Sequence, residues 1–209
     1  MEKMLVTQAL NELKTLGSRI DRAIAEADFI TASKVSEKNA APGKTKDVFN
    51  KEAKTSMQQI NDLIERREKI KAAVIASNAV TEVEIGGVKM TVAKAIDTKD
   101  SIEFKQDLLN MMKAQYAQAM KKVEDANQKM EKKIDDLVTT AYGKDGKDKI
   151  QESDFDAIAK PYRSANETGL VDPLGIEKKI KELSEYIEAF KSNVDSVLQI
   201  SNCTTFIEV

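Results

Sequence analysis

Residues 143–154, "GKDGKDKIQESD", have the residue types of a calcium-binding loop between two helices. An EF-hand loop takes oxygen ligands from its first, third and fifth positions and has a glycine at the sixth and a glutamate at the twelfth. With Asp154 as the twelfth position, Asp145 takes the third, but a lysine takes the fifth and an aspartate the sixth. Suitable oxygens then come from Asp145, the Lys149 carbonyl and Asp154 alone, and three lysines oppose a cation. We therefore expect a solvated turn at the tip of a helical hairpin, without a metal.

A second short motif has the residue types of a phosphate-binding loop. Gly43, Lys44 and Thr45 match the end of the loop that holds nucleotide phosphates at the start of a helix. That loop also needs a glycine five positions before Gly43, and this chain has Lys38 there. We therefore expect a flexible polar loop over residues 29–46, without nucleotide binding.

The chain has no histidine and a single cysteine, Cys203. Nucleophile systems that depend on a histidine base, and transition-metal sites with histidine ligands, are therefore excluded. One cysteine also excludes an internal disulfide and a zinc site built from cysteines. The groups that remain for catalysis are carboxylates, lysines, tyrosines or a bound hard cation. We expect no enzymatic activity, no catalytic residues, no cofactor and no metal.

The composition indicates long helices. Charged residues make up 33% of the 209 residues and aromatic residues 5%, with 8 glycines and 3 prolines, which is typical of helical chains. The formal net charge is -2, so nothing indicates a nucleic-acid partner or an anionic membrane surface. No apolar run reaches the length of about 18 residues that a spanning helix needs. The start, "MEKMLVTQALNELK", resembles no secretion signal, and we expect cytoplasmic synthesis.

Four runs of apolar residues spaced by three and four predict the helices that would position any site. The first covers residues 5–27 and carries Gly17 on its apolar seam, where we expect close approach of a neighbouring helix. The second begins near Asp47, a favourable cap. It ends at Asn78, a residue that tolerates the conformation found at helix ends.

The third and fourth helices are predicted by the same spacing. The third begins after Thr91 and continues to about residue 141, which gives about 75 Å at 1.5 Å per residue unless residues 97–101 break it. The fourth begins at Asp172, with the following proline in its first turn, and ends at Asn202.

Short strands are predicted where the second and fourth helices end. Residues 80–91 alternate apolar and polar side chains around Gly86-Gly87, which is typical of a β-hairpin. Residues 204–209 repeat the pattern after the fourth helix. Because a lone hairpin is marginally stable, we expect 204–209 to add a third strand to it. The second and fourth helices would then run in the same direction. The alternative is that 204–209 are a peptide bound by another protein.

These elements predict a mainly α single domain over residues 1–209. We expect an elongated antiparallel four-helix bundle or coiled coil with a small three-stranded antiparallel sheet at one end. Residues 143–171 would form a helical insertion at the opposite tip.

The order of these motifs resembles a family of small bacterial helical proteins sometimes labelled septicolysin. That family shows a helix ending at an N-x-x-T step, a threonine-initiated helix, a late V-D helix start and a closing I-Q-x-x-N-x-T-T. The matching residues are Asn78 and Thr81, Thr91, Val171-Asp172, and "LQISNCTT" over 198–205. The chain departs from the family at Cys203, where the family has tryptophan, and over residues 123–164, which have no clear counterpart. The resemblance implies a helical fold and no particular activity.

The partner-binding site predicted from the sequence lies on the far part of the third helix. That helix exceeds its neighbours by about 30 Å, yet its seam stays apolar at Val123, Met130, Ile134 and Leu137. Such a stripe must be covered. Residues 155–162 could fold back, but they supply few apolar side chains, so we expect a second chain, most simply another copy.

These observations predict a non-enzymatic structural or interaction protein. We expect it to be an oligomer or part of a larger complex, such as a bacteriophage or mobile-element particle, with incorporation into a virion after cytoplasmic synthesis. The alternative is a cytoplasmic adaptor or regulator that binds a partner helix. A cytolysin-type toxin is disfavoured because no helix is basic and strongly amphipathic enough to insert unaided.

Overall fold

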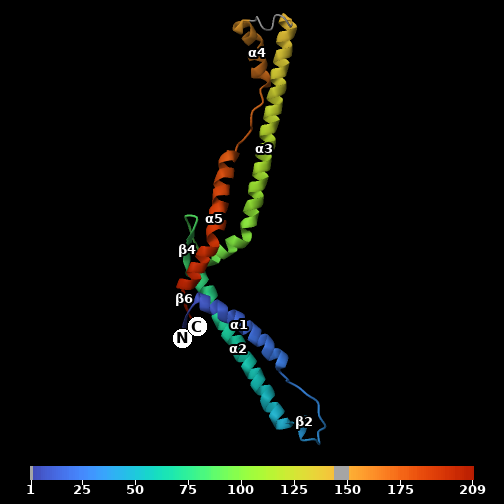
Figure 1. Cartoon of the computed structure of the whole chain (residues 1–209), viewed down its shortest axis with the longest axis vertical. Coiled ribbons are helices and arrows are strands. Elements are labelled where there is room, and N and C mark those ends of the chain that lie inside the picture. The colour runs from blue at the N-terminus through green and yellow to red at the C-terminus, as the bar shows by residue number, and fades with distance from the viewer. Residues whose placement is uncertain (1, 144–150) are drawn as a thin grey trace. The chain divides into compact units, whose positions relative to one another are not determined.

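The computed structural model describes residues 2–143 and 151–209. It is mainly helical, as the sequence predicts, with small antiparallel sheets (Figure 1). Where the sequence predicts one domain, the contacts gather in two compact units. Unit 1 comprises Met1–Asp100 and Ala189–Val209, and unit 2 comprises Ser101–Glu188.

Unit 1 is built on an antiparallel helix pair. The helix α1 spans Val6–Glu26 and α2 spans Lys46–Val80, close to the predicted bounds. The pair has an apolar seam with buried positions on both helices. Arg66 of α2 connects this helix to α1 and to the N-terminal segment. Its Nε donates to Glu12 of α1 at 2.9 Å, and its Nη2 donates to Glu2 at 2.6 Å.

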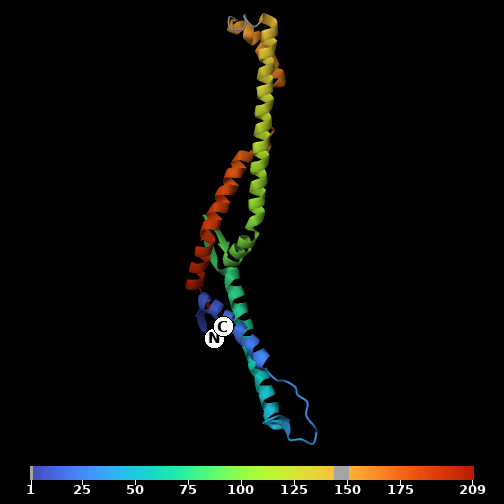
Figure 2. The same ribbon diagram turned by 45° about the vertical axis from the view of Figure 1, so that its right-hand side comes forward.

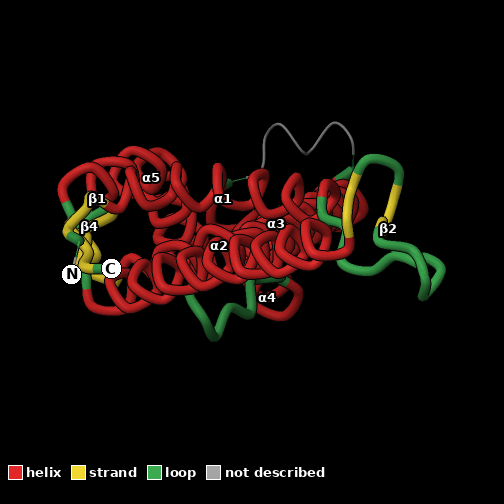
Figure 3. The backbone as a smooth tube through the Cα atoms, turned by 90° about the horizontal axis from the view of Figure 1, so that it is seen from below, coloured by secondary structure: helices red, strands yellow, loops and turns green. Residues whose placement is uncertain are grey.

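The last strand pairs with the first strand and not with the hairpin. β1, Lys3–Leu5, and β6, Phe206–Glu208, are antiparallel, with Met4 opposite Ile207. Both side chains are buried in the α1–α2 core, and the two chain ends lie side by side (Figure 3). The predicted three-stranded sheet is therefore wrong.

The hairpin has the predicted form. β4, Glu82–Ile85, and β5, Val88–Thr91, meet at Gly86-Gly87, and both glycines have positive φ. The hairpin stays two-stranded, and its turn lies against the last helix. A Cβ added at Gly86 would lie 3.0 Å from the Cβ of Ala189.

Two further long helices follow the hairpin in the chain. α3 spans Val92–Tyr142 and is continuous through residues 97–101. Thr91 caps it, because its Oγ1 accepts from the Lys94 N–H at 3.2 Å. The last helix, α5, spans Ile176–Thr204.

Residues 167–175 lead into α5. The Asp172 carboxylate accepts from the N–H groups of Leu174 at 3.2 Å and Ile176 at 2.8 Å. Asp172 therefore caps the start of α5 as predicted, but the helix begins at Ile176 and the proline lies in the preceding turn. The predicted first-turn position of that proline is wrong.

Unit 2 contains most of α3, the first part of α5 and a further helix, α4, which spans Glu152–Asn166 within the predicted insertion 143–171. Lys105 of α3 lies over the Tyr186 ring of α5 at 3.9 Å. Tyr116, further along α3, interacts with Glu177, further back along α5. The two helices are therefore antiparallel, and they lie side by side in Figures 1 and 2. The predicted four-helix bundle is not confirmed, because the contacts of α1 and α2 gather in unit 1 and most of α3 belongs to unit 2.

Candidate functional site

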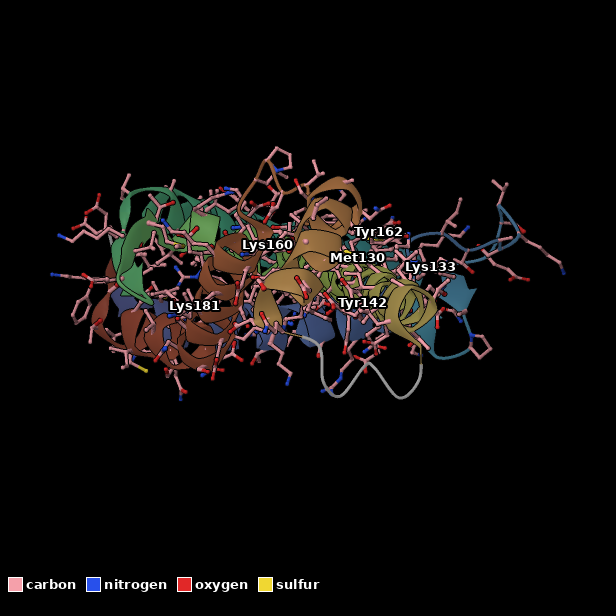
Figure 4. The ribbon with its side chains drawn as sticks, turned by 90° about the horizontal axis from the view of Figure 1, so that it is seen from above. Met130, Lys133, Tyr142, Lys160, Tyr162 and Lys181 are labelled. Atoms are coloured by element: carbon pink, nitrogen blue, oxygen red, sulfur yellow. The ribbon has the colours of Figure 1, made fainter. Side chains whose placement is uncertain are left out.

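Two of the four predicted partner-binding residues are buried inside unit 2. Met130 and Ile134 of α3 pack with Val138 of the same helix and Ala159 of α4. Figure 4 labels Met130 and Tyr162, which come from these two facing helices. Ile134 is 0% exposed. The expectation that a second chain must cover these two residues is therefore wrong.

Met130 and Ile134 are covered because α4 packs directly on this part of α3. α4 runs antiparallel to α3 and places one apolar stripe over it. Its members are Phe155, Ile158, Ala159 and Tyr162. Four side chains are too few for the whole stripe, but α4 has to cover only about two turns of α3, from Met130 to Val138.

A forked ion pair fixes α4 at this level. Arg163 donates from Nε to Glu131 Oε1 and from Nη2 to Oε2, both at 2.8 Å. Planar guanidinium and carboxylate groups prefer this two-point geometry. The hydrogen bonds raise the pKa of Arg163 and lower the pKa of Glu131. The charges are thus stabilised in place on opposite helices.

A second two-point contact fixes the chain after α4. The Asn127 side chain donates from Nδ2 to the Thr168 carbonyl and accepts from the Thr168 N–H at its Oδ1, both at 2.9 Å. The Asn127 side chain thus makes the two hydrogen bonds to the Thr168 backbone that a neighbouring β-strand would make. It sets the level on α3 at which α4 ends and the chain continues toward α5.

The other two predicted residues are partly exposed. Val123 lies one turn before Asn127, and Leu137 lies beside buried Val138. They therefore remain candidates for an intermolecular contact.

A different face of α3 is more open, and none of the four residues predicted from the sequence lies on it. Phe104, Leu108 and Met111 are 77%, 53% and 57% exposed. Their spacing of four and three residues places them on one side of the helix. We call these three residues the outer α3 stripe. By helical geometry the stripe lies opposite buried Ile102 and Leu109.

A signal for this stripe is present in the sequence. Leu108-Leu109 and Met111-Met112 are adjacent apolar pairs, and neighbouring residues in a helix point about 100° apart. One member of each pair can pack on the buried side of α3, and the other must then point away from that side.

The glycine–lysine–threonine motif has structural roles that need no nucleotide. Gly43 has φ +76° and forms the turn between β2, Asn39–Ala41, and β3, Lys44–Thr45. Lys44 pairs with Glu52, and that hydrogen bond raises the lysine pKa. Thr45 Oγ1 accepts from the Val48 N–H at 3.4 Å and so caps α2. The cap is therefore Thr45 and not the predicted Asp47.

The calcium-like stretch falls largely outside the described residues, because 144–150, including Asp145 and Lys149, are not among them. Asp154 lies in the first turn of α4, and its N–H donates to the Gln151 carbonyl at 3.0 Å. Within residues 2–143 and 151–209, no three acidic or cysteine side chains gather as metal ligands would.

No helix in the described ranges combines the length and apolarity required to cross a bilayer.

Comparison with models of protein families finds no match, and comparisons with curated proteins and with solved structures find none either. The resemblance to the septicolysin-labelled proteins therefore stays a prediction from the motifs.

Proposed function

We propose that this chain is a non-enzymatic subunit of a larger protein assembly, of the kind that forms a bacteriophage or mobile-element particle. The outer α3 stripe carries the proposal. Isolated exposed apolar residues are ordinary on protein surfaces. Three on one helical face, of which Phe104 is 77% exposed, are typical of a surface that another protein covers. In this role the chain is made in the cytoplasm and then enters the particle.

A second candidate is an adaptor that binds a single helix of its partner. The positions of the stripe, i, i+4 and i+7, are those through which one amphipathic helix contacts another. Such a contact is one helix wide, as the stripe from Phe104 to Met111 is. This candidate predicts a small complex of fixed stoichiometry and no particle.

The test compares the chain with its stripe variant in extracts of the source cells. We expect the wild type to sediment in a density gradient as part of a complex much larger than the 23.2 kDa chain. Phe104→Glu with Leu108→Glu should return it to the top of the gradient. Lys121→Glu, an exposed charge change on the same helix, is the matched control and should sediment as wild type.

The size of the complex separates the two candidates. Sedimentation with a particle supports the first candidate. A small discrete complex that Phe104→Glu with Leu108→Glu dissociates supports the adaptor. A wild-type chain that sediments as a monomer in the extract would contradict both.

A further inference from the structure

The α1–α2 pair of unit 1 has an apolar face that is only half covered within the chain. Leu10, Gly17 and Ile24 follow one another at seven-residue intervals on α1, and Met57 and Ile64 do so on α2. Seven residues are close to two helical turns, so each set lies along one side of its helix. The four apolar side chains among them are between 36% and 50% exposed. We call these five residues the α1–α2 face.

A hollow of about 400 Å³ lies at the middle of this face. Its lining consists of Gly17, Ile20, Asp21, Ile64, Arg67 and Glu68. A Cβ added at Gly17 would meet no atom within 4 Å. The close approach expected at Gly17 is therefore not made by any residue that the structure describes. Glycine inside a helix nevertheless weakens it relative to alanine.

We propose that the α1–α2 face binds the same face of a second copy, so that two helix pairs form a four-helix bundle. The inference rests on the proposed role as an assembly subunit and names one of its contacts. The spacing on α1 is what makes the face self-complementary. Leu10 and Ile24 each lie seven residues from Gly17, about 10.5 Å at 1.5 Å per residue. A two-fold axis over Gly17 therefore places Leu10 of each copy against Ile24 of the other.

The second helix supports the same arrangement. α2 is antiparallel to α1 and shares the central hollow through Ile64. Met57, two turns before Ile64, therefore lies at the level of Ile24. Leu10 of the second copy would enter between Met57 and Ile24, and the missing side chain at Gly17 would let the two α1 helices approach closely.

The charges around the hollow suit a two-fold contact. Arg67, Asp21 and Glu68 line it, and none of the three has an ion-pair partner among the described residues. Each copy thus contributes one cation and two carboxylates at the same place. In an isologous contact, Arg67 of one copy can pair with a carboxylate of the other.

The dimensions agree with a dimer interface of modest size. The 21 residues of α1 give a length of about 31 Å, and two helices side by side are about 20 Å wide. Their product, about 600 Å² per copy, corresponds to the lower end of stable interfaces, about 1,200 Å² in total.

The test is sedimentation equilibrium of the purified full-length chain over a range of micromolar concentrations. We expect a reversible dimer of twice 23.2 kDa. Leu10→Glu with Ile24→Glu should weaken the dimer by about a hundredfold or more. Both copies carry both substitutions, so each introduced carboxylate would be buried in the interface once from each copy. Ser18→Glu, exposed on the same helix, is the matched control and should leave the dimer intact.

Gly17→Leu is the sharper variant, because it removes the hollow while improving helix propensity. We expect a chain at least as resistant to urea as the wild type and a dimer at least about tenfold weaker. Loss of the dimer could then not be attributed to unfolding. A dimer that Gly17→Leu leaves unchanged would overturn the proposal, as would a wild type that stays monomeric.

This outcome is distinct from failure of the proposed function. A purified chain that is monomeric but sediments with a large complex in cell extracts would overturn the dimer and leave the assembly role standing. A chain that is monomeric in both would overturn both.

Discussion

Arg163 and Glu131 face each other from α4 and α3 through two parallel hydrogen bonds of 2.8 Å. The pair lies at the rim of the apolar contact that holds α4, one residue from Met130 in sequence. It joins the last turn of α4 to α3.

Protonation of Glu131 should loosen α4. The hydrogen bond from Arg163 lowers the folded-state pKa of Glu131 below its ordinary value of 4.5. The stabilisation is therefore present in full above that ordinary value and is lost as the pH falls through the lowered one. We expect hydrogen-exchange protection of the α4 amides to decrease over this acidic range in the wild type. Glu131→Gln should show weaker protection at neutral pH and a smaller decrease. Equal pH profiles for the two proteins would contradict this assignment.

Asn127→Leu should release the segment after α4. The substitution removes both hydrogen bonds to Thr168, each worth about 0.5–1.5 kcal/mol. We expect faster exchange of the Thr168 amide, with little change in the helical amides around residue 127. Gln128→Leu is the control, since Gln128 bonds within its own helix to Glu124.

Ile134→Lys should detach α4 rather than block an intermolecular contact. Ile134 is fully buried under α4, and a lysine there would be buried without a partner. A free helix of 15 residues is marginal in water, so helical content measured by circular dichroism should fall. Lys133→Ala, an exposed neighbour, should leave it unchanged. Intact helical content in Ile134→Lys would favour an open stripe on α3 that a second chain covers.

Ile207→Ala should destabilise the α1–α2 pair of unit 1. Ile207 is buried in the core formed with Met4 and Ile70, and such truncations cost about 2–5 kcal/mol. Phe206→Ala is the control on the same strand. Phe206 is exposed and has Lys3 over its ring at 4.9 Å, a contact worth about 0.5–1 kcal/mol. Urea unfolding should separate the two variants clearly, and equal losses would argue against the observed strand pairing.

Gly86→Ala should cost more stability than Gly87→Ala. Both glycines have positive φ, which costs a residue with a Cβ about 1–2 kcal/mol. A Cβ at Gly86 would also press on Ala189 at 3.0 Å, whereas one at Gly87 would meet nothing within 4 Å. Adding Ala189→Gly should recover part of the loss in the Gly86 variant. A double-mutant cycle in urea without favourable coupling would contradict this contact.

The sequence by itself determined the long helices and the β4–β5 hairpin of this protein, but not the short strands β1, β2 and β3. Heptad spacing predicts the long helices to within a few residues, since burying one stripe of a helix requires that period. Gly86-Gly87 predicts the hairpin turn, because two successive residues of positive φ strongly favour glycine. The absence of histidine limits the possible chemistry, because no imidazole can serve as a general base or a metal ligand.

Tertiary structure alone decided which elements pair. The strand Phe206–Glu208 has a pattern that fits the hairpin or β1 equally well, and a three-residue pattern cannot choose between edges. It pairs with β1 because that pairing buries Met4 and Ile207 together in the α1–α2 core. The cover of Ile134 likewise depends on α4 returning at the level fixed by Asn127 and Glu131. Those contacts join residues 32 and 41 positions apart, and helical periodicity, which relates residues three and four apart, carries no information about them.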